Sequence, residues 1–390
     1  MPEPPNRRRP PHPWGTPPWS VDFRPRKRPI PEHADFVIVG GGFSGLSAAA
    51  WLRRLAPTKS VLVLERATLG DGASGRTGGM ALAETAAGNL PGLGDVLRGY
   101  KQILRALNVK AELSLPGAYE LARGGPSNES PIHWSDSGDL RAVKKVPGGT
   151  INPGKVVSGL ARAAQSAGAQ IIEHAEVRNL EAADHGSAPA EIHLKLRICQ
   201  RGKSSTRIIR AGRVLLATNA QCLDLPALSS TTHPKLTLAL ATEPLTRAQI
   251  KSLGLASRRP FYTVDLPYLW GRLQQDNSAI FGAGLVHAPA ERQLHKINVG
   301  EGEAAERLAW LESRVRQLHA VLKNVRITHR WGGPILLTDE AKPIFRQHPR
   351  LAQVTILAGF NGHGVALSVY LGRWAAQHLA GKRRLPRWAS

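Results

Sequence analysis

The sequence predicts an α/β fold in which a dinucleotide-binding domain of the Rossmann type is interrupted by a second, strand-rich domain. Three observations support this. A glycine cluster near residue 40 joins a strand-like run to a helix-like run, strand and helix patterns alternate again near the C-terminus, and the middle of the chain contains mainly short strand-like segments. With 390 residues the chain is long enough for two domains with a substantial core.

The first unit joins a strand to a helix through the glycine cluster. Phe36–Gly40 is a short apolar run, and Ser44–Leu55 has apolar residues at helical spacing. Val61–Leu64 is a second apolar run that ends at Glu65. This pattern predicts a β-α-β unit of about thirty residues with neighbouring parallel strands.

The rest of the chain continues these patterns. A loop at Gly70–Met80 precedes a mostly helical stretch to about Val109, and short strand-like pieces occupy Leu113–Val146. The remaining expected elements are the helix Gly154–Gln165, the strands Gln170–Glu173, Val214–Leu216, Pro260–Val264, Tyr268–Leu273 and Ala279–Gly282, a helix at about 302–322, the strand Val354–Ala358 and the helix Val365–Ala380.

The two ends of the chain differ from the folded part. Residues 1–33 are rich in Pro, Arg and His, so we expect a disordered, extended arm that belongs to no core. Residues 382–390 form a short basic tail. The expected domain boundaries are 34–112, 147–232 and 331–381 for the dinucleotide-binding domain, and 113–146 and 233–330 for the substrate domain.

Composition restricts the class of protein. Two cysteines cannot build a disulfide framework, no metal-ligand spacing is present, and no run approaches the ~18 apolar residues of a membrane span. These features favour a cytoplasmic protein without a metal site. The net charge of +23 is compatible with contact to nucleic acid or anionic lipid, but we favour a highly charged, solvated surface.

The glycine cluster has the spacing of a dinucleotide fingerprint. Gly40 permits a tight turn, Gly42 lets backbone N–H groups approach a pyrophosphate, and Gly45 lets the helix pack closely on the strand. The helix N-terminus favours the negative phosphates. Glu65, at the end of the next strand, is placed to accept hydrogen bonds from ribose hydroxyls.

The fingerprint alone fits both flavin and nicotinamide dinucleotides. Two other loops favour flavin. Gly70–Met80 offers small residues and the hydroxyls of Ser74 and Thr77, beside Arg76. The loop Gly359–Gly364 leads into a helix whose N-terminus can stabilise negative charge at the N1–C2=O edge of a reduced flavin.

Several motifs occur in a family-specific order. They are the GGGFSGL start, Glu65-Arg66, GASGRTGGM, LLATNA at 215–220, WGGP at 331–334 and LAGFNGHGVAL at 357–367. In this order they resemble the FAD-dependent D-amino-acid oxidase (DAO) superfamily, nearest its gamma-glutamylputrescine oxidase branch, over roughly residues 35–380. The resemblance implies a glutathione-reductase-like FAD-binding domain and a strand-rich α+β substrate domain.

The resemblance also implies which residues contact FAD. It places Phe43 and Ser44 at the diphosphate, Glu65 and Arg66 at the adenosine ribose, and Val177 at the adenine. The implied contacts are Gly40, Gly42, Phe43, Ser44, Gly45, Glu65, Arg66, Ala73, Ser74, Arg76, Thr77, Gly78, Gly79, Met80, Val177, Thr218, Asn361, Gly362, His363, Gly364 and Val365.

The sequence departs from the relatives in two places. Glycine and D-amino-acid oxidases carry an arginine just after the Trp-x-Gly motif, where this chain has Ile335. Because a guanidinium binds a carboxylate with two parallel hydrogen bonds, its loss favours an amine over a simple α-amino acid. Sarcosine oxidases place a lysine near flavin N5, whereas the comparable strand here reads Ala279-Ile280-Phe281, which leaves the electron acceptor open.

The implied reaction oxidises the C–N bond of a small amine by hydride transfer to flavin N5, and the imine is then hydrolysed. His363 and Arg76 are the polar candidates beside the flavin, although His363 fits equally well as a residue that only satisfies backbone groups. Tyr262, with Tyr268 and Trp270, offers an aromatic wall for a cation. Arg272 is the candidate for a remote carboxylate.

Two other functions stay open. An RNA-modifying flavoenzyme would use the basic surface for phosphate contacts, but it should need the arginine that Ile335 replaces. A membrane-peripheral amine dehydrogenase would place its basic tails on anionic lipid and pass electrons to quinone. The sequence does not decide the amine, the oligomeric state or whether FAD is covalently attached.

Overall fold

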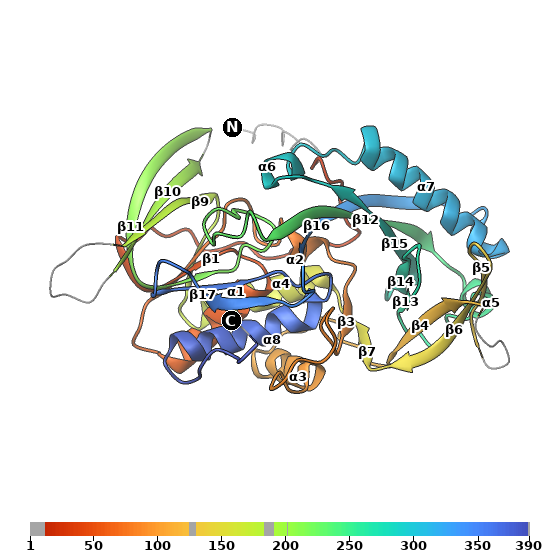
Figure 1. Ribbon diagram of the computed structural model, residues 1–390, viewed down its shortest axis with the longest axis horizontal. Helices are drawn as coiled ribbons and strands as arrows, with labels where there is room; N and C mark the ends of the chain where they lie inside the picture. Colours follow the sequence, from red (N-terminus) through yellow and green to blue (C-terminus); the bar gives the residue numbers. More distant parts are fainter. Residues whose placement is uncertain (1–11, 125–129, 183–190, 201, 389–390) are drawn as a thin grey trace, which may run out of the picture.

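Two large sheets lie next to each other and account for most of the molecule (Figure 1). The computed structural model describes residues 12–124, 130–182, 191–200 and 202–388. Within those residues, no helix is both long and apolar enough to cross a membrane. The two-sheet α/β architecture confirms the predicted fold class.

The first sheet has a parallel centre. β1 pairs in parallel with β2 and β11, while β2 pairs with β8 and β11 with β18 in the same sense. Strands that are covered on both faces need continuous apolar sequence, and every residue of β2 and β18 is buried. The strand order is β17 (Ile344–Gln347), β18 (Val354–Ala358), β11 (Lys203–Leu216), β1 (His33–Val39), β2 (Val61–Leu64) and β8 (Gln170–Ile172).

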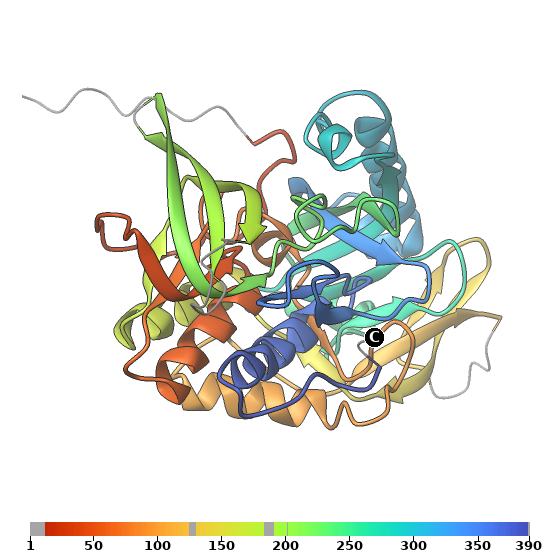
Figure 2. The ribbon, with the colours of Figure 1, turned by 60° about the vertical axis from the view of Figure 1, so that its left-hand side comes forward.

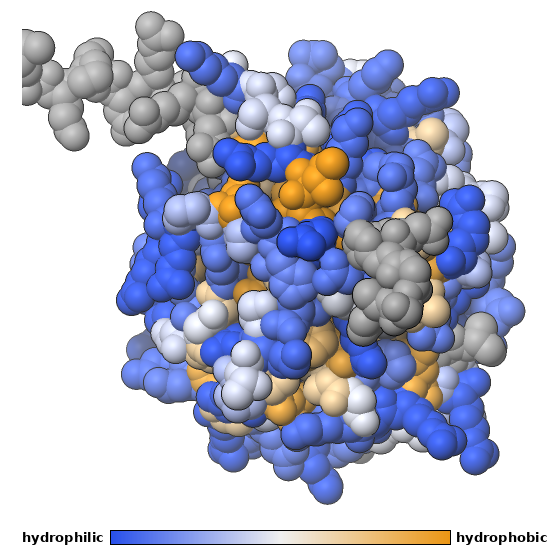
Figure 3. All heavy atoms as spheres, turned by 90° about the vertical axis from the view of Figure 1, so that its left-hand side faces the viewer, coloured by the Kyte–Doolittle hydropathy of each residue, from blue (hydrophilic) through white to orange (hydrophobic). Residues whose placement is uncertain are grey.

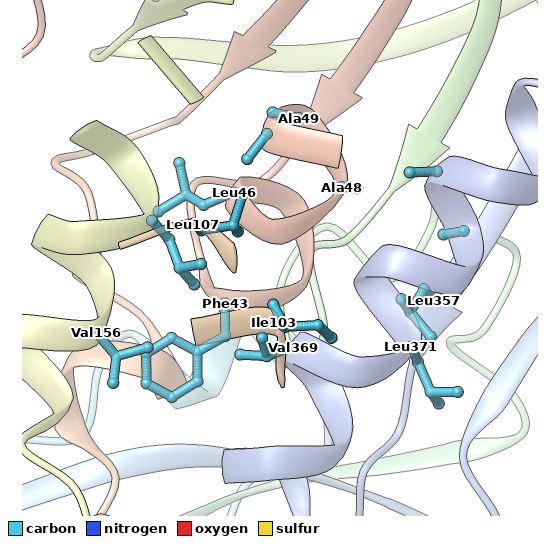
Figure 4. Close-up of a cluster of buried hydrophobic side chains, with 14 of the residues drawn as sticks. Phe43, Leu46, Ala48, Ala49, Ile103, Leu107, Val156, Leu357, Val369 and Leu371 are labelled. Carbon is cyan, nitrogen blue, oxygen red and sulfur yellow. The ribbon is translucent and has the colours of Figure 1, made fainter. Parts of the chain in front are cut away.

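Four helices cover one face of this sheet: α1 (Phe43–Leu55), α3 (Val96–Ala106), α4 (Pro153–Ser166) and α8 (Gly364–Leu379). Their shared core includes Phe43 and Leu46 of α1 with Val369 and Leu371 of α8 (Figure 4). Small residues allow α1 and α8 to approach closely. A Cβ on Gly372 would lie 2.5 Å from the carbonyl oxygen of Ser44.

The other face carries an antiparallel extension made by β9 (Ala175–Ala182), β10 (Ile192–Gln200) and the long β11 (Figure 2). Inward residues of these strands, such as Leu194 and Ile209, are fully buried. The outer surface of this end of the molecule is mainly hydrophilic, with small hydrophobic patches (Figure 3).

The second sheet is antiparallel except for the parallel pair β13–β4. Helix α7 (Gly302–Leu318) packs on one face through Leu311 and Val315, and the opposite face meets the first domain. The strand order is β16 (Ile327–Thr338), β12 (Thr232–Pro244), β15 (Ser278–His287), β14 (Trp270–Leu273), β13 (Phe261–Thr263), β4 (Ala118–Arg123), β6 (Asp139–Val146) and β5 (His133–Ser135).

The remaining elements are short. β3 (Met80–Leu82) and β7 (Gly148–Thr150) form a two-stranded sheet. The short helices are α2 (Ala73–Arg76), α5 (Arg247–Ser252), α6 (Glu291–Leu294) and the 3-10 helix η1 (Ala320–Leu322).

Three sequence-based expectations are wrong. The expected arm is ordered from residue 12, and the Trp14 side chain is only 1% exposed, because its indole lies in an apolar cluster with residues of both sheets and its Nε1 donates to Leu294 O at 3.1 Å. The expected helical stretch after Met80 contains β3 and turns before α3 begins at Val96, since Gly88, Gly92 and Gly94 adopt positive φ. The expected domain boundary at 330/331 falls inside β16, which pairs with β12 on both sides of it. Residues 1–11 of the arm and 389–390 of the tail lie outside the described residues.

Candidate functional site

The turn between β1 and α1 leaves a space that side chains would fill. Gly40 has a φ of +112°, and a Cβ there would lie 2.5 Å from the carbonyl oxygen of Ala217. A Cβ on Gly45 would lie 2.1 Å from the carbonyl oxygen of Gly40, so only glycine lets α1 start this close to β1. Gly42 supplies no side-chain cap to α1, so the first-turn N–H groups other than that of Phe43, which donates to Ser74 Oγ, are left for a bound anion.

Glu65 lies beside this turn at the end of β2. Its Oε2 accepts a hydrogen bond from Gly41 N at 2.8 Å, and its Oε1 accepts one from Ala67 N at 2.9 Å. Burial raises the pKa of the Glu65 carboxyl, although these two bonds oppose the rise. Arg66 turns toward α6, where its Nη1 lies 3.3 Å from His295 Nε2 and 3.9 Å from Glu291 Oε1.

The N-terminus of α2 faces the turn Gly40–Gly42, called the glycine turn, on the side away from Glu65. Ser74 Oγ accepts a hydrogen bond from Phe43 N at 2.9 Å, and a Cβ on Gly42 would lie 2.8 Å from the same oxygen. Phe43 and Ser44 are 2% and 5% exposed, so their side chains are not available to a ligand.

A hollow extends from the glycine turn along the C-terminal ends of the parallel strands β1, β2 and β11. Gln221, which follows β11, was not predicted from the sequence. Its Nε2 is buried and has no hydrogen-bond partner among the described residues. Cys222 also lines the hollow, and burial raises the pKa of its thiol to about 12, so the thiol stays protonated. Of the predicted cofactor residues, the lining contains Gly40, Gly42, Glu65, Arg66, Ala73, Ser74, Val177 and Thr218.

The loop that follows α2 lies between the two domains. A Cβ on Gly78 would lie 2.1 Å from the Trp270 ring, and Gly79 has a φ of +76°. Thr77 ends α2 and Met80 begins β3. The Arg76 guanidinium turns away to the N-terminal segment, where it donates to the carbonyl oxygen of Gly15 at 2.9 Å. With 8% of its surface exposed, its side chain is not placed to act on a substrate.

The loop before α8 is held by hydrogen bonds of Asn361 and is exposed at Gly362. Asn361, with φ of +51°, accepts a hydrogen bond from Thr338 N at 2.7 Å and donates to Gly359 O at 2.7 Å. Gly362 is exposed, and Gly364 and Val365 begin α8. His363 Nδ1 lies 3.2 Å from the carbonyl oxygen of Asn361.

The protonation state of His363 follows from this contact. Burial lowers the pKa of His363, while the bond to Asn361 and the carboxylate of Glu84 oppose the shift. Because a carbonyl oxygen can only accept, Nδ1 carries the proton and Nε2 keeps a free lone pair. The imidazole is therefore neutral near pH 7, with an acceptor available to a ligand.

One row of side chains crosses the second sheet on the face toward the first domain. Strand registers place Glu120, Tyr262, Trp270, Gly282, Ala239 and Trp331 directly beside one another on successive strands. The Trp331 end of the row is anchored, because its Nε1 donates to Arg76 O at 2.9 Å. At the other end, Tyr262 Oη donates to Glu120 Oε1 at 3.0 Å.

Arg272 lies two residues after Trp270 on β14, and its side chain points into the interface with the first domain. Its Nε donates to the carbonyl oxygen of Gly78, and its guanidinium stacks over Trp19 at 5.7 Å. The side chain is 5% exposed, and burial lowers its pKa to about 10. The structure therefore does not support the expectation that Arg272 binds a substrate carboxylate.

Residues 35–378 match the family model described as FAD dependent oxidoreductase, DAO. The chain belongs to the DAO family. It is 25% identical over 387 residues to gamma-glutamylputrescine oxidoreductase of Escherichia coli, which covers 89% of this chain and 84% of that one. It is 26% identical to the probable oxidoreductase OrdL of Haemophilus influenzae, covering 90% and 84% of the two chains. The solved structure of L-proline dehydrogenase from P. horikoshii superposes with a TM-score of 0.70 at 21% identity, over 93% and 97%.

The site of this DAO-family chain fits FAD. The glycine turn leaves a cradle without Cβ atoms, and the first turn of α1 offers backbone N–H groups to a diphosphate. The unpaired Gln221 amide is a further donor in the wall of the hollow. Glu65 keeps acceptor capacity for ribose hydroxyls, because each carboxylate oxygen accepts more than one hydrogen bond.

Proposed function

We propose that this DAO-family chain holds FAD along the hollow and oxidises the C–N bond of a small amine at the face of the second sheet. The observation that carries the proposal is one end of the row of side chains on the second sheet. There Glu120, Tyr262 and Trp270 lie beside one another, and the Trp270 ring packs against Gly78. A carboxylate, a phenol and an indole favour a cationic ligand.

The names of two relatives support C–N chemistry. One is a gamma-glutamylputrescine oxidoreductase and another is an L-proline dehydrogenase. Bound FAD would supply the two-electron acceptor. The protein supplies substrate orientation, a proton acceptor and exclusion of water.

His363 is the proton acceptor in this proposal. An amine must lose its ammonium proton before its C–N bond can be oxidised, and His363 Nε2 has a free lone pair at the start of α8. The buried, neutral imidazole can take that proton, and the Glu84 carboxylate stabilises the resulting imidazolium.

Of the candidate residues that the structure describes on this face, none is placed to bind an α-carboxylate. Ile335 is apolar, and Arg272 and Arg76 are committed to backbone carbonyls. In contrast, the Glu120 side chain is 20% exposed, with Oε1 hydrogen-bonded to Tyr262 and Oε2 3.9 Å from the exposed Lys144 Nζ. Because each carboxylate oxygen can accept more than one hydrogen bond, Glu120 can still accept one from an ammonium group. We therefore favour amines over simple α-amino acids.

The test is anaerobic bleaching of the flavin in the purified protein. The panel comprises putrescine, gamma-glutamylputrescine, sarcosine, glycine, D-alanine and D-proline. We expect putrescine or gamma-glutamylputrescine to bleach the flavin, and Glu120→Gln to raise the concentration required for half-maximal bleaching about tenfold, since a charged hydrogen bond contributes about 1.5–3 kcal/mol. Bleaching by glycine or D-alanine alone would refute the amine assignment.

A further inference from the structure

The N-terminal segment 12–23 runs between the two domains. Trp14 is buried in a cluster with residues of both sheets, Trp19 packs on the inner face of the second sheet, and Val21 and Phe23 pack on the helix-side core of the first sheet. Backbone bonds fix its path: Gly332 N donates to Trp14 O at 2.8 Å, and a Cβ on Gly154 would lie 2.0 Å from Ser20 O. One short segment thus joins three separate apolar clusters.

Trp19 reaches residues 75–78, which comprise the end of α2 and the start of the loop that follows it. Its Nε1 donates to the carbonyl oxygen of Gly75 at 2.7 Å. The next donors come from the second sheet: Trp331 Nε1 holds Arg76 O at 2.9 Å, and Arg272 Nε holds Gly78 O. Three of four consecutive carbonyls, at residues 75, 76 and 78, are therefore held by side-chain N–H groups on one side of the loop.

The three donors also contact each other. The rings of Trp19 and Trp331 meet edge to face with centroids 5.6 Å apart, and the Arg272 guanidinium lies over Trp19 at 5.7 Å. Aromatic and cation–π contacts of this kind contribute little individually, but they restrict the rotamers of all three donors together. Trp19 is the member that contacts both of the others.

This arrangement restrains the surface that the loop presents to the cofactor. A trans peptide is planar, so holding its carbonyl on one side fixes the direction of the N–H on the other side. Gly72, Ala73 and Ser74 line the hollow just before the held carbonyls, and Gly75 is locked because its Cβ would lie 2.1 Å from Gly70 O. Movement at residues 75–78 would therefore displace the wall of the hollow.

We propose that Trp19 is a positioning residue for FAD: its indole holds the loop at residues 75–78 from behind and so keeps the facing wall of the hollow in its binding conformation. The inference rests on FAD binding in the hollow, which is part of the proposed function, and is independent of the amine. Trp19 acts through the loop and does not itself line the hollow.

The decisive variant is Trp19→Phe, which keeps an aromatic ring and removes the N–H donor. FAD affinity is measured by titrating the apoprotein and following the quenching of flavin fluorescence, and thermal unfolding of the apoprotein is measured in parallel. We expect the Kd for FAD to rise about fivefold to tenfold, as for loss of one hydrogen bond, and the visible circular dichroism of the bound flavin to change. Trp310→Phe, on the exposed surface of α7, is the matched control and should leave both unchanged.

Two results would overturn the proposal. One is a Trp19→Phe protein with the wild-type Kd and flavin spectrum. The other is a loss of apoprotein stability without any change in FAD affinity, which would make Trp19 a purely structural residue. If the wild-type protein binds no FAD, the proposed function fails as well; if it binds FAD and is bleached by amines while Trp19→Phe behaves normally, only this inference fails.

Discussion

Gln221 shows why a single residue can be overlooked in a sequence and still matter for binding. It lies in no motif, and its chemistry is common on protein surfaces. The fold places its amide in the wall of the hollow, where Nε2 is buried without a partner among the residues that the structure describes. A buried donor of this kind is costly unless a ligand pairs with it.

Replacing Gln221 by methionine removes this donor and keeps the length of the side chain. We expect the Kd for FAD to rise about tenfold or more, because a hydrogen bond to a charged group contributes about 1.5–3 kcal/mol. The apoprotein should unfold at the same temperature or higher, since the unpaired amide is gone. Gln317→Met, on the exposed side of α7, is the control. An unchanged Kd for Gln221→Met would show that the amide does not reach the cofactor.

His363 leads to a prediction about pH. Burial lowers the pKa of His363 below the ordinary value of 6.5. The imidazole is therefore neutral when the pH is above its pKa and becomes charged as the pH falls through it. The fraction of free amine also falls with pH, so the logarithm of the anaerobic flavin reduction rate should steepen below pH 6.5. His363→Gln should remove this extra steepening and slow reduction about a hundredfold. His287→Gln, at an exposed position, should keep the wild-type profile.

At the residue scale, the sequence was most informative where the backbone needs a particular residue. Gly40 and Gly45 could be predicted because a turn and a close approach exclude any Cβ, and the structure shows both restrictions. Arg272 and Arg76 could not be placed correctly. Both belong to motifs near the site, but the direction of a long side chain depends on which carbonyls the folded chain brings within its reach.

At the scale of elements, local patterns located the parallel sheet well. The strand predicted at Val61–Leu64 has the same bounds as the observed β2. The observed helices α1, α4 and α8 begin within one residue of their predicted starts. The antiparallel extension of β9 to β11 was not predicted, because β11 is exposed over much of its length and only its last residues form a continuous apolar run. Pairing between distant segments, not local propensity, stabilises such strands.

One charged cluster joins the elements of the second sheet. Asp136, in the turn between β5 and β6, accepts hydrogen bonds from Arg314 Nε at 2.9 Å and Nη2 at 2.6 Å, and from Arg123 of β4. The Asp136 side chain is 3% exposed and that of Arg314 is 6% exposed. Burial raises the pKa of Asp136, but the two guanidinium groups outweigh it and leave the pKa below 3.8.

Asp136→Asn should lower the free energy of unfolding by about 3–5 kcal/mol, because it leaves two guanidinium groups with reduced compensation. The contribution of the carboxylate is present above the unfolded-state pKa of about 3.8 and is lost as the pH falls through the lower folded-state pKa. The stability difference between variant and wild type should therefore shrink below pH 4 in urea titrations. Asp139→Asn, whose side chain is 71% exposed, is the control, and an equal effect of both substitutions would contradict this account.

At the scale of the whole molecule, two sheets meet across the N-terminal segment and the loop at residues 75–78. The sequence indicated two domains but not what joins them. Residues 12–23 are rich in proline and follow no strand or helix period, so their role could not be inferred from pattern. It depends on indole rings that reach both domains at once, which only the assembled fold shows.

The net charge of +23 also acts on the whole molecule. One concentration of cations lies where α8 ends, around a groove of about 910 Å³ lined by Arg213, Lys382, Arg383 and Arg384. The described residues that line it include no carboxylate. Arg213 donates to Leu379 O, and the Arg383 guanidinium stacks on Trp374, so these charges are held near one another. Repulsion among such groups opposes the compact state.

We therefore expect salt to stabilise this protein. Raising NaCl from about 20 mM to 300 mM shortens the Debye length from roughly 20 Å to about 6 Å, which screens repulsion between exposed cations more than it weakens buried pairs such as Arg314–Asp136. The Tm should rise with salt, and the triple variant Lys382→Gln, Arg383→Gln, Arg384→Gln should show a smaller rise. A Tm that falls with salt would mean that attractive ion pairs dominate the folded state despite the excess positive charge, and an unchanged slope in the variant would locate the repulsion away from the α8 groove.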